Sequence, residues 1–285
     1  MRSWLSVLLS AALLAVGAAS AFAVPSLAGP TGLIMLPTAD IAPSSLWQMG
    51  VGSRSIRIQQ MYQPESTDVS EWTFNALKGV ADDAEVFVTY QRVTDGTDTD
   101  VWEYGGKYLI GEDLFPRRGF LGGTKVAVGG SLGRWAESVE FTSNAMYLPS
   151  DVETRRLYLV ATKQLAPTYT GEWSWEAPAG TRIVGTVGLL YLRVDPDLGE
   201  AHSLVRPFIG VEVTGRRMLT LLAEYRLKDS SVEDNEEFSV AVRKPFGSST
   251  NLEVGLTNAS PIGLGIEEMN LFARITFAFG AEAYQ

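Results

Sequence analysis

Cysteine is absent from the 285-residue chain, and histidine occurs once, as His202. Without thiols the protein has no disulfide framework, no thiolate zinc site, no cysteine nucleophile and no acylated-cysteine anchor. Basic residues are also scarce, because 23 Lys and Arg stand against 33 Asp and Glu for a net charge of −10. No basic run breaks that balance. The resulting field repels polyanions, so we expect no nucleic acid among the partners.

The first 23 residues have the pattern of a secretory signal. Arg2 precedes an apolar run, which gives way to small residues ending in Ala21-Phe22-Ala23. We expect cleavage before Val24; an uncleaved membrane anchor is the alternative, disfavoured by the weakly hydrophobic Ala/Ser/Gly-rich second half. No later segment reaches the roughly 18 consecutive apolar residues of a membrane helix. The sequence therefore predicts an exported protein without a further helical span.

Alternation of apolar and polar residues, punctuated by turn-forming residues, predicts twelve strands and no convincing helix after the signal. The predicted strands are 46–62, 71–80, 84–93, 100–110, 123–135, 153–165, 181–194, 205–215, 219–228, 237–246, 251–258 and 270–279. The gap at 166–180 is long, and a further hairpin within it would raise the count to fourteen.

The connections between these strands favour a membrane barrel over a soluble sandwich, although alternation alone fits both. Tight turns such as 81–83 and 247–250 alternate with longer loops such as 229–236 and 259–269, a habit of outer-membrane barrels. The fold class that we predict is an all-β, antiparallel transmembrane β-barrel of 12 to 14 strands. We divide the chain into four predicted parts: a signal peptide at 1–23, a periplasmic or plug segment at 24–45, the barrel at 46–279 and a C-terminal tail at 280–285.

The last predicted strand, Asn270–Phe279, resembles the closing strand of bacterial outer-membrane barrels, whose terminal aromatic residue is part of an assembly signal. Phe277 and Phe279 supply the aromatic residues here, although six residues follow Phe279. This resemblance implies the barrel-assembly machinery as a partner.

A lipid-facing position for Tyr225 and Phe277 places a set of charged side chains inside the barrel. The predicted lumen-facing charges are Glu212, Glu224, Arg226, Arg243, Glu253 and Arg274. Charges in a narrow lumen need partners or water. They either line a small polar channel and set its selectivity, or form salt bridges across a packed lumen with no open pore.

Residues 25–40 resemble the opening of YjbH-like outer-membrane proteins, and the stretches 46–51, 77–90 and 106–108 fit the same family. The motif residues are Gly29, Thr31, Gly32, Pro37, Thr38 and Ala39. The resemblance implies an outer-membrane barrel linked to exopolysaccharide production or export, with polysaccharide-export proteins as partners. It supplies no catalytic residues, and longer members of the family carry more than this chain holds.

The segment 24–45 has two physical possibilities. Its glycines and prolines forbid a regular helix, while the apolar run Leu33-Ile34-Met35-Leu36 needs an apolar environment. The segment either folds into the barrel mouth and partly plugs the lumen, or rests on the rim as a periplasmic linker.

Candidates for catalysis or metal binding are weak. Gly129 to Gly133 matches the Gly-x-Ser-x-Gly motif around Ser131, but no helix follows it, and His202 is expected in a polar loop. Two acidic runs contain carboxylates suited to Ca²⁺, without the spacing of a known loop: Asp95, Asp98 and Asp100, and Asp195, Asp197 and Glu200. Nothing fixes the separation that Glu172 and Glu176 would need as glycosidase carboxylates. We therefore predict no catalytic residues, no metal and no cofactor.

These patterns together predict a non-enzymatic β-barrel of the cell outer membrane, in contact with outer-membrane lipid. Its predicted role is structural or auxiliary, in exopolysaccharide or envelope biogenesis or export. A small passive, porin-like channel is the first alternative, and an envelope hydrolase is the second.

Overall fold

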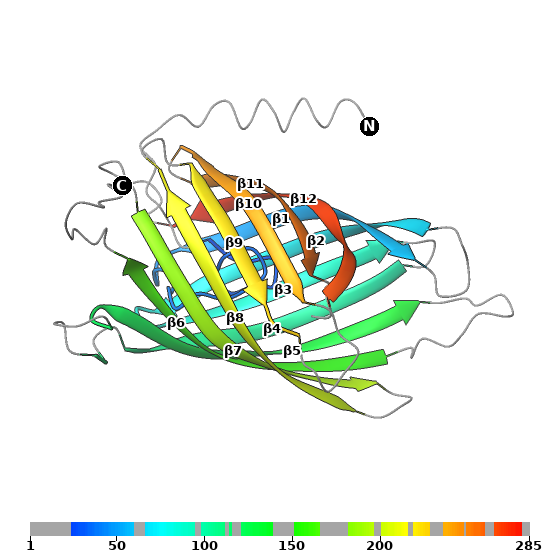
Figure 1. The fold of residues 1–285 in the computed structure, drawn as a ribbon, viewed down its shortest axis with the longest axis horizontal. Helices are drawn as coiled ribbons and strands as arrows, with labels where there is room; N and C mark the ends of the chain where they lie inside the picture. The colour runs from blue at the N-terminus through cyan, green and yellow to red at the C-terminus, as the bar shows by residue number, and fades with distance from the viewer. Residues whose placement is uncertain are drawn as a thin grey trace, which may run out of the picture.

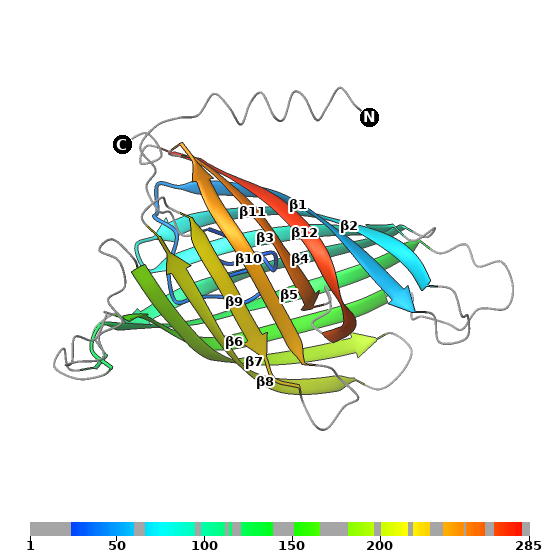
Figure 2. The same ribbon diagram turned by 45° about the horizontal axis from the view of Figure 1, so that its top comes forward.

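The chain forms a closed antiparallel β-barrel (Figures 1 and 2). The computed structural model describes residues 24–59, 66–94, 98–111, 114–115, 121–138, 151–165, 182–196, 201–215, 219–228, 236–247, 249–259 and 265–280. Within these ranges there are twelve strands, each paired with its neighbours in sequence, and β1 closes the barrel on β12. No helix in the described part of the chain is long and apolar enough to cross a bilayer.

The strands have the following bounds: β1 Trp47–Gln59, β2 Ser66–Ala81, β3 Ala84–Thr94, β4 Asp98–Gly111, β5 Thr124–Ser138, β6 Asp151–Leu165, β7 Arg182–Pro196, β8 His202–Thr214, β9 Thr220–Arg226, β10 Glu237–Phe246, β11 Thr250–Ala259 and β12 Gly265–Phe279.

The predicted fold class is confirmed, and the largest boundary errors occur where strands extend past their alternating segments. β2 begins at Ser66 and β12 at Gly265, each five residues before the predicted start. The added residues are mostly polar, so apolar alternation could not reveal them. His202, expected in a loop, is the first residue of β8. The signal peptide, the tail after Gly280 and the extra hairpin in 166–180 lie outside the described residues.

The barrel has two different ends. The connections β2–β3, β4–β5, β6–β7, β8–β9 and β10–β11 lie at one end, which we call the turn end, and three of them are short, at 82–83, 215–219 and 247–249. β1 begins and β12 finishes there, with Trp47 paired to Phe279. The opposite end carries the connections β1–β2, β3–β4, β5–β6, β7–β8, β9–β10 and β11–β12, and we call it the loop end.

The distribution of side chains is inverted relative to a soluble protein. Along β11, Leu252, Val254 and Leu256 are exposed on the outer face, whereas Glu253 and Thr257 are buried inside. The same inversion recurs around the barrel, where large apolar residues between 36% and 61% exposed cover the outside and charged or hydroxyl side chains fill the inside. Such a surface suits a lipid environment and a polar lumen.

Candidate functional site

The lumen contains the chain's own N-terminal segment, residues 24–45, which we call the plug. Figures 1 and 2 show it as the dark blue trace inside the barrel. Leu33, Ile34, Leu36 and Ala39 are at most 2% exposed. Of the two positions considered for this segment, the structure has the one inside the barrel.

Two apolar patches on the lumen wall receive the plug. Leu27, Leu33 and Ile34 pack with Leu222, Ala241 and Phe272 of β9, β10 and β12. Leu36 and Ala39 pack with five residues of the opposite wall: Ala127, Tyr158, Val160, Leu190 and Phe208. The plug is therefore held by apolar contacts on both sides of the lumen, and its burial removes these side chains from water.

The plug has a fold of its own that depends on two glycines. Bridges join Pro25 to Thr31 and Gly32 to Pro37, so the segment doubles back twice. Gly29 has φ +111°, and a Cβ there would lie 2.6 Å from Thr89 Oγ1 and also overlap the Phe87 ring. A Cβ on Gly32 would overlap the Leu36 carbonyl. Only glycine fits at both positions.

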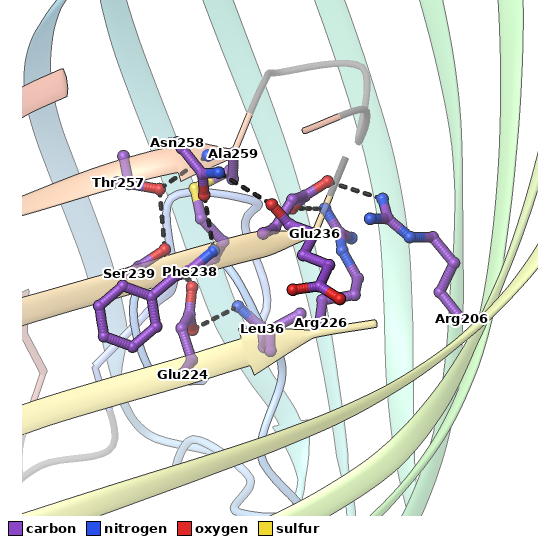
Figure 3. Close-up of polar contacts among 12 residues, drawn as sticks. Leu36, Arg206, Glu224, Arg226, Glu236, Phe238, Ser239, Thr257, Asn258 and Ala259 are labelled. Carbon is purple, nitrogen blue, oxygen red and sulfur yellow. Dashed lines mark hydrogen bonds and ion pairs between the residues drawn. The ribbon is translucent and has the colours of Figure 1, made fainter. Parts of the chain in front are cut away.

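Glu224 of β9 holds the plug through its backbone. Its carboxylate accepts hydrogen bonds from the amides of Ile34 at 3.1 Å, Met35 at 2.9 Å and Leu36 at 3.1 Å. Figure 3 shows Glu224 directed at the Leu36 amide from the barrel wall. Consecutive amides that converge on one carboxylate make a strong anion site, so the plug backbone itself stabilises the Glu224 charge.

A second anchor joins Thr31 of the plug to Glu85 of β3 and Lys107 of β4. Glu85 accepts hydrogen bonds from the Thr31 amide at 2.9 Å and the Ala42 amide at 2.9 Å. Lys107 lies 3.0 Å from Glu85 and donates to the carbonyls of Thr31 and Thr38, each at 3.0 Å. Both charged side chains are fully buried, and the plug satisfies the hydrogen bonds that the ion pair leaves over.

A third anchor is a charge ladder across β10, β11 and β12. The register pairs Arg243 with Glu253 and Glu253 with Arg274, and the ion pairs measure 2.7 Å and 2.9 Å. Arg243 also donates to the Leu33 carbonyl at 2.8 Å, and Arg274 donates to the Pro25 carbonyl. The ladder thus pairs the Glu253 carboxylate with two guanidinium groups, and both arginines also bind plug carbonyls.

The remaining lumen charges form separate groups. Glu237, the first residue of β10, pairs with Arg206 at 2.7 Å and with Arg226, and Figure 3 labels the two arginines. Glu212, the most exposed of the predicted set, lies 3.8 Å from Arg243. The structure therefore brings Glu212, Arg243, Glu253 and Arg274 together. It places Arg226 in a separate group, and Glu224 of β9 binds the plug amides.

Sequence reasoning missed several charges inside the barrel: the buried Glu85, Glu103, Lys107, Arg206 and Glu237, and the half-buried Arg156. A face was assigned only in the C-terminal strands, where alternation is clearest. The same parity applied to β3, β4 and β8 would have found most of them. In β3, for example, Glu85, Phe87 and Thr89 alternate with exposed Val86 and Val88.

Polar space remains beside the plug. A cavity of about 270 Å³ lies between it and the wall of β7 to β11, lined by Asp40, Arg182, Glu212 and Arg243 among others. A smaller cavity of about 40 Å³ lies against β3 to β7. The Nε of Arg182 is buried and has no hydrogen-bond partner among the residues that the structure describes.

The structure separates the candidate catalytic pair. Ser131 is buried in β5, where its hydroxyl donates to Glu103 inside the barrel. His202 is exposed at the start of β8. Ser131 therefore takes part in the lumen network and faces no histidine.

Two of the acidic residues considered for Ca²⁺ binding accept hydrogen bonds from neighbouring side chains. Asp100 accepts a hydrogen bond from Tyr90 at 2.6 Å, and Asp195 accepts from Arg193. Asp98 begins β4. Five others lie outside the described residues: Asp95, Asp197 and Glu200 of the acidic runs, and the pair Glu172 and Glu176. No group of His, Cys, Asp or Glu within the described ranges is arranged to hold a metal ion.

Solved structures with the same architecture are outer-membrane barrels. No protein-family model and no curated protein sequence matches this chain. The KdgM porin in complex with disordered oligogalacturonate aligns with a TM-score of 0.50 and 11% identity, over 81% of this chain and 99% of the porin. The KdgM porin alone gives a TM-score of 0.50 and 10% identity over the same shares. The chain therefore has the twelve-stranded antiparallel barrel fold of outer-membrane porins.

Proposed function

We propose that this protein is an outer-membrane barrel that acts as a gated conduit for small polar solutes, closed at rest by its own N-terminal plug. One observation carries the proposal: the lumen wall is polar and charged, and the plug that occupies it is held by hydrogen bonds, ion pairs and small apolar patches. The wall of the barrel does not depend on the plug for its closure, because β1 pairs with β12 directly.

The membrane location follows from the outer face. Leu157, Ile209 and Leu271 are 60%, 57% and 61% exposed, in a protein whose inner face carries the charges. Water would make this arrangement unfavourable, whereas hydrocarbon favours it. The porin fold of the comparison structures supports the same location, and the signal-like first 23 residues supply the export route that it requires.

The conduit follows from the width and chemistry of the lumen. Twelve strands enclose more space than the eight-stranded barrels that side chains alone fill. In this barrel the plug occupies that space, next to a polar cavity of about 270 Å³. Moving the plug exposes Glu224, Arg243 and Arg274 to a water-filled lumen, where their charges select among solutes. One comparison porin is named in complex with an oligogalacturonate, and for this chain we propose the broader class of small hydrophilic solutes.

Cross-linking the plug to the wall tests the gate directly, because the chain has no cysteine. A Cβ built on Gly210 of β8 lies 3.5 Å from Leu33 Cγ, the atom that a cysteine sulfur replaces. In planar bilayers we expect the oxidised Leu33→Cys/Gly210→Cys double variant to be silent, and reduction to restore the activity of the wild type. Leu33→Cys alone is the control for the substitution itself, because Gly210→Cys alone would bring its Cβ into overlap with Leu33.

Removal of residues 24–45 complements the cross-link, because it takes the plug out of the lumen instead of fixing it there. We expect discrete conductance steps that are larger and more frequent than those of the wild type. Equal conductance from the oxidised, reduced and plug-deleted forms rules out gating by the plug. A plug-deleted barrel that folds and yet never conducts rules out the conduit.

A structural role in exopolysaccharide export is a second candidate, and one observation favours it. The segments that resemble YjbH-like proteins meet in space, since Thr31, Glu85 and Lys107 come from three of them and form one buried cluster. The similarity therefore falls on the residues that hold the plug. Unchanged exopolysaccharide secretion in a deletion strain of the native host, complemented or not, excludes this role.

An envelope hydrolase has no support from the described site, and we propose that the protein is not an enzyme. Ser131→Ala and His202→Ala should each leave lipid and glycan turnover unchanged. A loss of turnover in either variant contradicts this proposal.

A further inference from the structure

A groove of about 520 Å³ crosses the outer face of β4 to β7, on the side of the barrel away from the charge ladder. Strand register arranges the outward residues at and beside the groove in rows across the four strands. One row is Tyr104, Leu132, Arg155 and Arg193, and the next row toward the turn end is Gly106, Gly130, Leu157 and Tyr191.

Glycine creates the floor of the groove. Gly130 points outward between Leu132 and Leu157, which are 45% and 60% exposed. A Cβ on Gly130 would lie only 2.8 Å from the Arg156 carbonyl oxygen and from Leu157 Cδ2, so the site admits no larger residue without movement. The result is a slot with a backbone floor at Gly130 and apolar walls, a surface that suits contact with a hydrocarbon chain.

Charged side chains lie at the loop-end side of this slot. Arg193 pairs with Asp195 at 2.9 Å, whereas Arg155 lies at the longer distances of 3.6 Å from Glu153 and 4.0 Å from Asp195. Arg134 stands opposite Glu153 in the register. The Arg155 and Arg193 side chains are 55% and 44% exposed, so both guanidinium groups are accessible from outside the barrel.

The position of the cluster relative to the apolar surface sets its depth in a membrane. Outward residues on the same strands toward the turn end are apolar, among them Leu159, Val187 and Leu189. An outward Arg costs about 2–4 kcal/mol at the bilayer midplane and about 0–1 kcal/mol near an interface. Trp102 and Tyr104, both more than half exposed, flank the cluster as interfacial aromatic residues do. Arg155 and Arg193 therefore lie at the level of lipid phosphates.

We propose that this groove is a binding site for the lipid A part of lipopolysaccharide, with a phosphate on Arg155 and Arg193 and an acyl chain over Gly130. Guanidinium groups bind phosphate oxygens bidentately, and the apolar slot adjoins them on the membrane side. The loop end of an outer-membrane barrel faces the leaflet that holds lipopolysaccharide. The inference rests on the proposed membrane location and is independent of conduction through the lumen.

Native mass spectrometry of the detergent-purified full chain, titrated with diphosphorylated lipid A, tests the site. We expect the Arg155→Gln/Arg193→Gln variant to lose about tenfold or more in apparent affinity, as expected for lost bonds to a charged group. Lys244→Gln is the matched control, because Lys244 is an exposed outward cation on β10, across the barrel, and its loss should change nothing.

Two further arms separate the phosphate from the acyl chain. Lipid A without phosphates should bind the wild type as weakly as the intact lipid binds the double variant. Leu157→Trp, which narrows the slot and keeps both arginines, should also weaken binding, and it covers the case in which the double variant does not fold. Inorganic phosphate should not compete at concentrations that match the lipid.

Equal binding of lipid A by the wild type, the double variant and Leu157→Trp overturns the site, as does equal binding of intact and dephosphorylated lipid A. Weak lipid binding together with redox-gated conductance rejects this inference alone. Absence of the protein from the outer membrane rejects both proposals.

Discussion

At the scale of single residues, the lumen shows how buried charges are satisfied by a chain segment far away in sequence. Glu224 meets the plug amides across 188 to 190 positions of sequence, and Glu85 meets Thr31 across 54. An unpartnered buried charge is strongly destabilising, so each of these contacts stabilises both the wall residue and the plug. Removing either partner affects the other.

Replacing Glu224 by alanine tests this dependence. The amides of Ile34, Met35 and Leu36 lose their acceptor, so we expect the free energy of unfolding to fall by about 2–3 kcal/mol or more. Urea unfolding in detergent micelles, followed by tryptophan fluorescence, measures the change. Glu224→Gln keeps one acceptor oxygen and should lose less; an equal loss in both variants would contradict the assigned role.

The Glu85–Lys107 pair calls for a double-mutant cycle. Lys107→Met leaves a buried carboxylate without its cation and should lower the free energy of unfolding by about 3 kcal/mol or more. Glu85→Gln with Lys107→Met removes both charges, and we expect the combined loss to be smaller than the sum of the single losses. Additive losses would show that the two groups do not interact.

At the scale of elements, the plug and the wall have complementary shapes. Gly79 of β2 and Gly210 of β8 lack the side chains that would occupy plug space, since a Cβ at either overlaps Ala42 or Leu33. A glycine inside a strand usually weakens the strand. Here the missing side chain leaves room for the plug against the barrel wall.

Gly210→Ala should therefore displace the plug. The added methyl group overlaps Leu33 Cδ1, and we expect a loss of about 1–3 kcal/mol with increased conductance. Leu33→Ala removes the atoms that clash, so the double variant should regain part of the resting closure. Planar-bilayer recordings of Gly210→Ala, Leu33→Ala and the double variant measure the conductance of each. A Gly210→Ala barrel that does not conduct would contradict the close packing of Leu33 against Gly210.

The closing strand has its own test. Phe277 and Phe279 stack with ring centroids 6.4 Å apart on the outer face of β12, where Phe279 pairs with Trp47. We propose that these rings help the barrel-assembly machinery to recognise the strand. Phe277→Ala/Phe279→Ala should slow barrel formation severalfold in vesicles that contain the machinery, measured by gel mobility over time. Phe238→Ala, an exposed aromatic of β10, is the control and should assemble at the normal rate.

At the scale of the whole molecule, the inverted surface and the closed hydrogen-bonded wall explain why the fold needs a membrane. Closure pairs every strand on both sides and leaves no free edge in the hydrocarbon. The exterior is apolar over its whole circumference, as Met49, Val128, Val205 and Leu252 illustrate. Charges concentrate in the lumen and toward the loop end.

A detergent gel provides the corresponding measurement. A closed barrel resists unfolding by the detergent at room temperature, so the unheated protein should migrate differently from the boiled protein. Fractionation of cells should recover it with outer membranes. A protein found wholly in the soluble periplasmic extract, with no heat-dependent mobility, would contradict the membrane assignment.

Local pattern was enough to predict the strands. The alternation of Leu252, Glu253, Val254 and Leu256 assigns each side chain to a face of the sheet, because successive residues of a strand point to opposite sides. Connection lengths then favoured a barrel. The missed starts of β2 and β12 lie where the strands extend beyond the apolar surface and alternation carries no signal.

Tertiary structure decided the rest, namely the seat of residues 24–45 and the partner of each buried charge. The sequence alone allowed Leu33 and Ile34 a place in the lumen or on the rim, since both positions bury apolar surface. The position in the lumen is favoured only in the closed barrel, because there the Glu224 carboxylate accepts hydrogen bonds from the plug amides. The sequence by itself thus determined a disulfide-free β-barrel through its lack of cysteine and its alternating strands, and the closed fold determined that the chain fills its own lumen. The physical reason is that face assignment is local, whereas the pairing of buried charges depends on which distant segments the closed wall brings together.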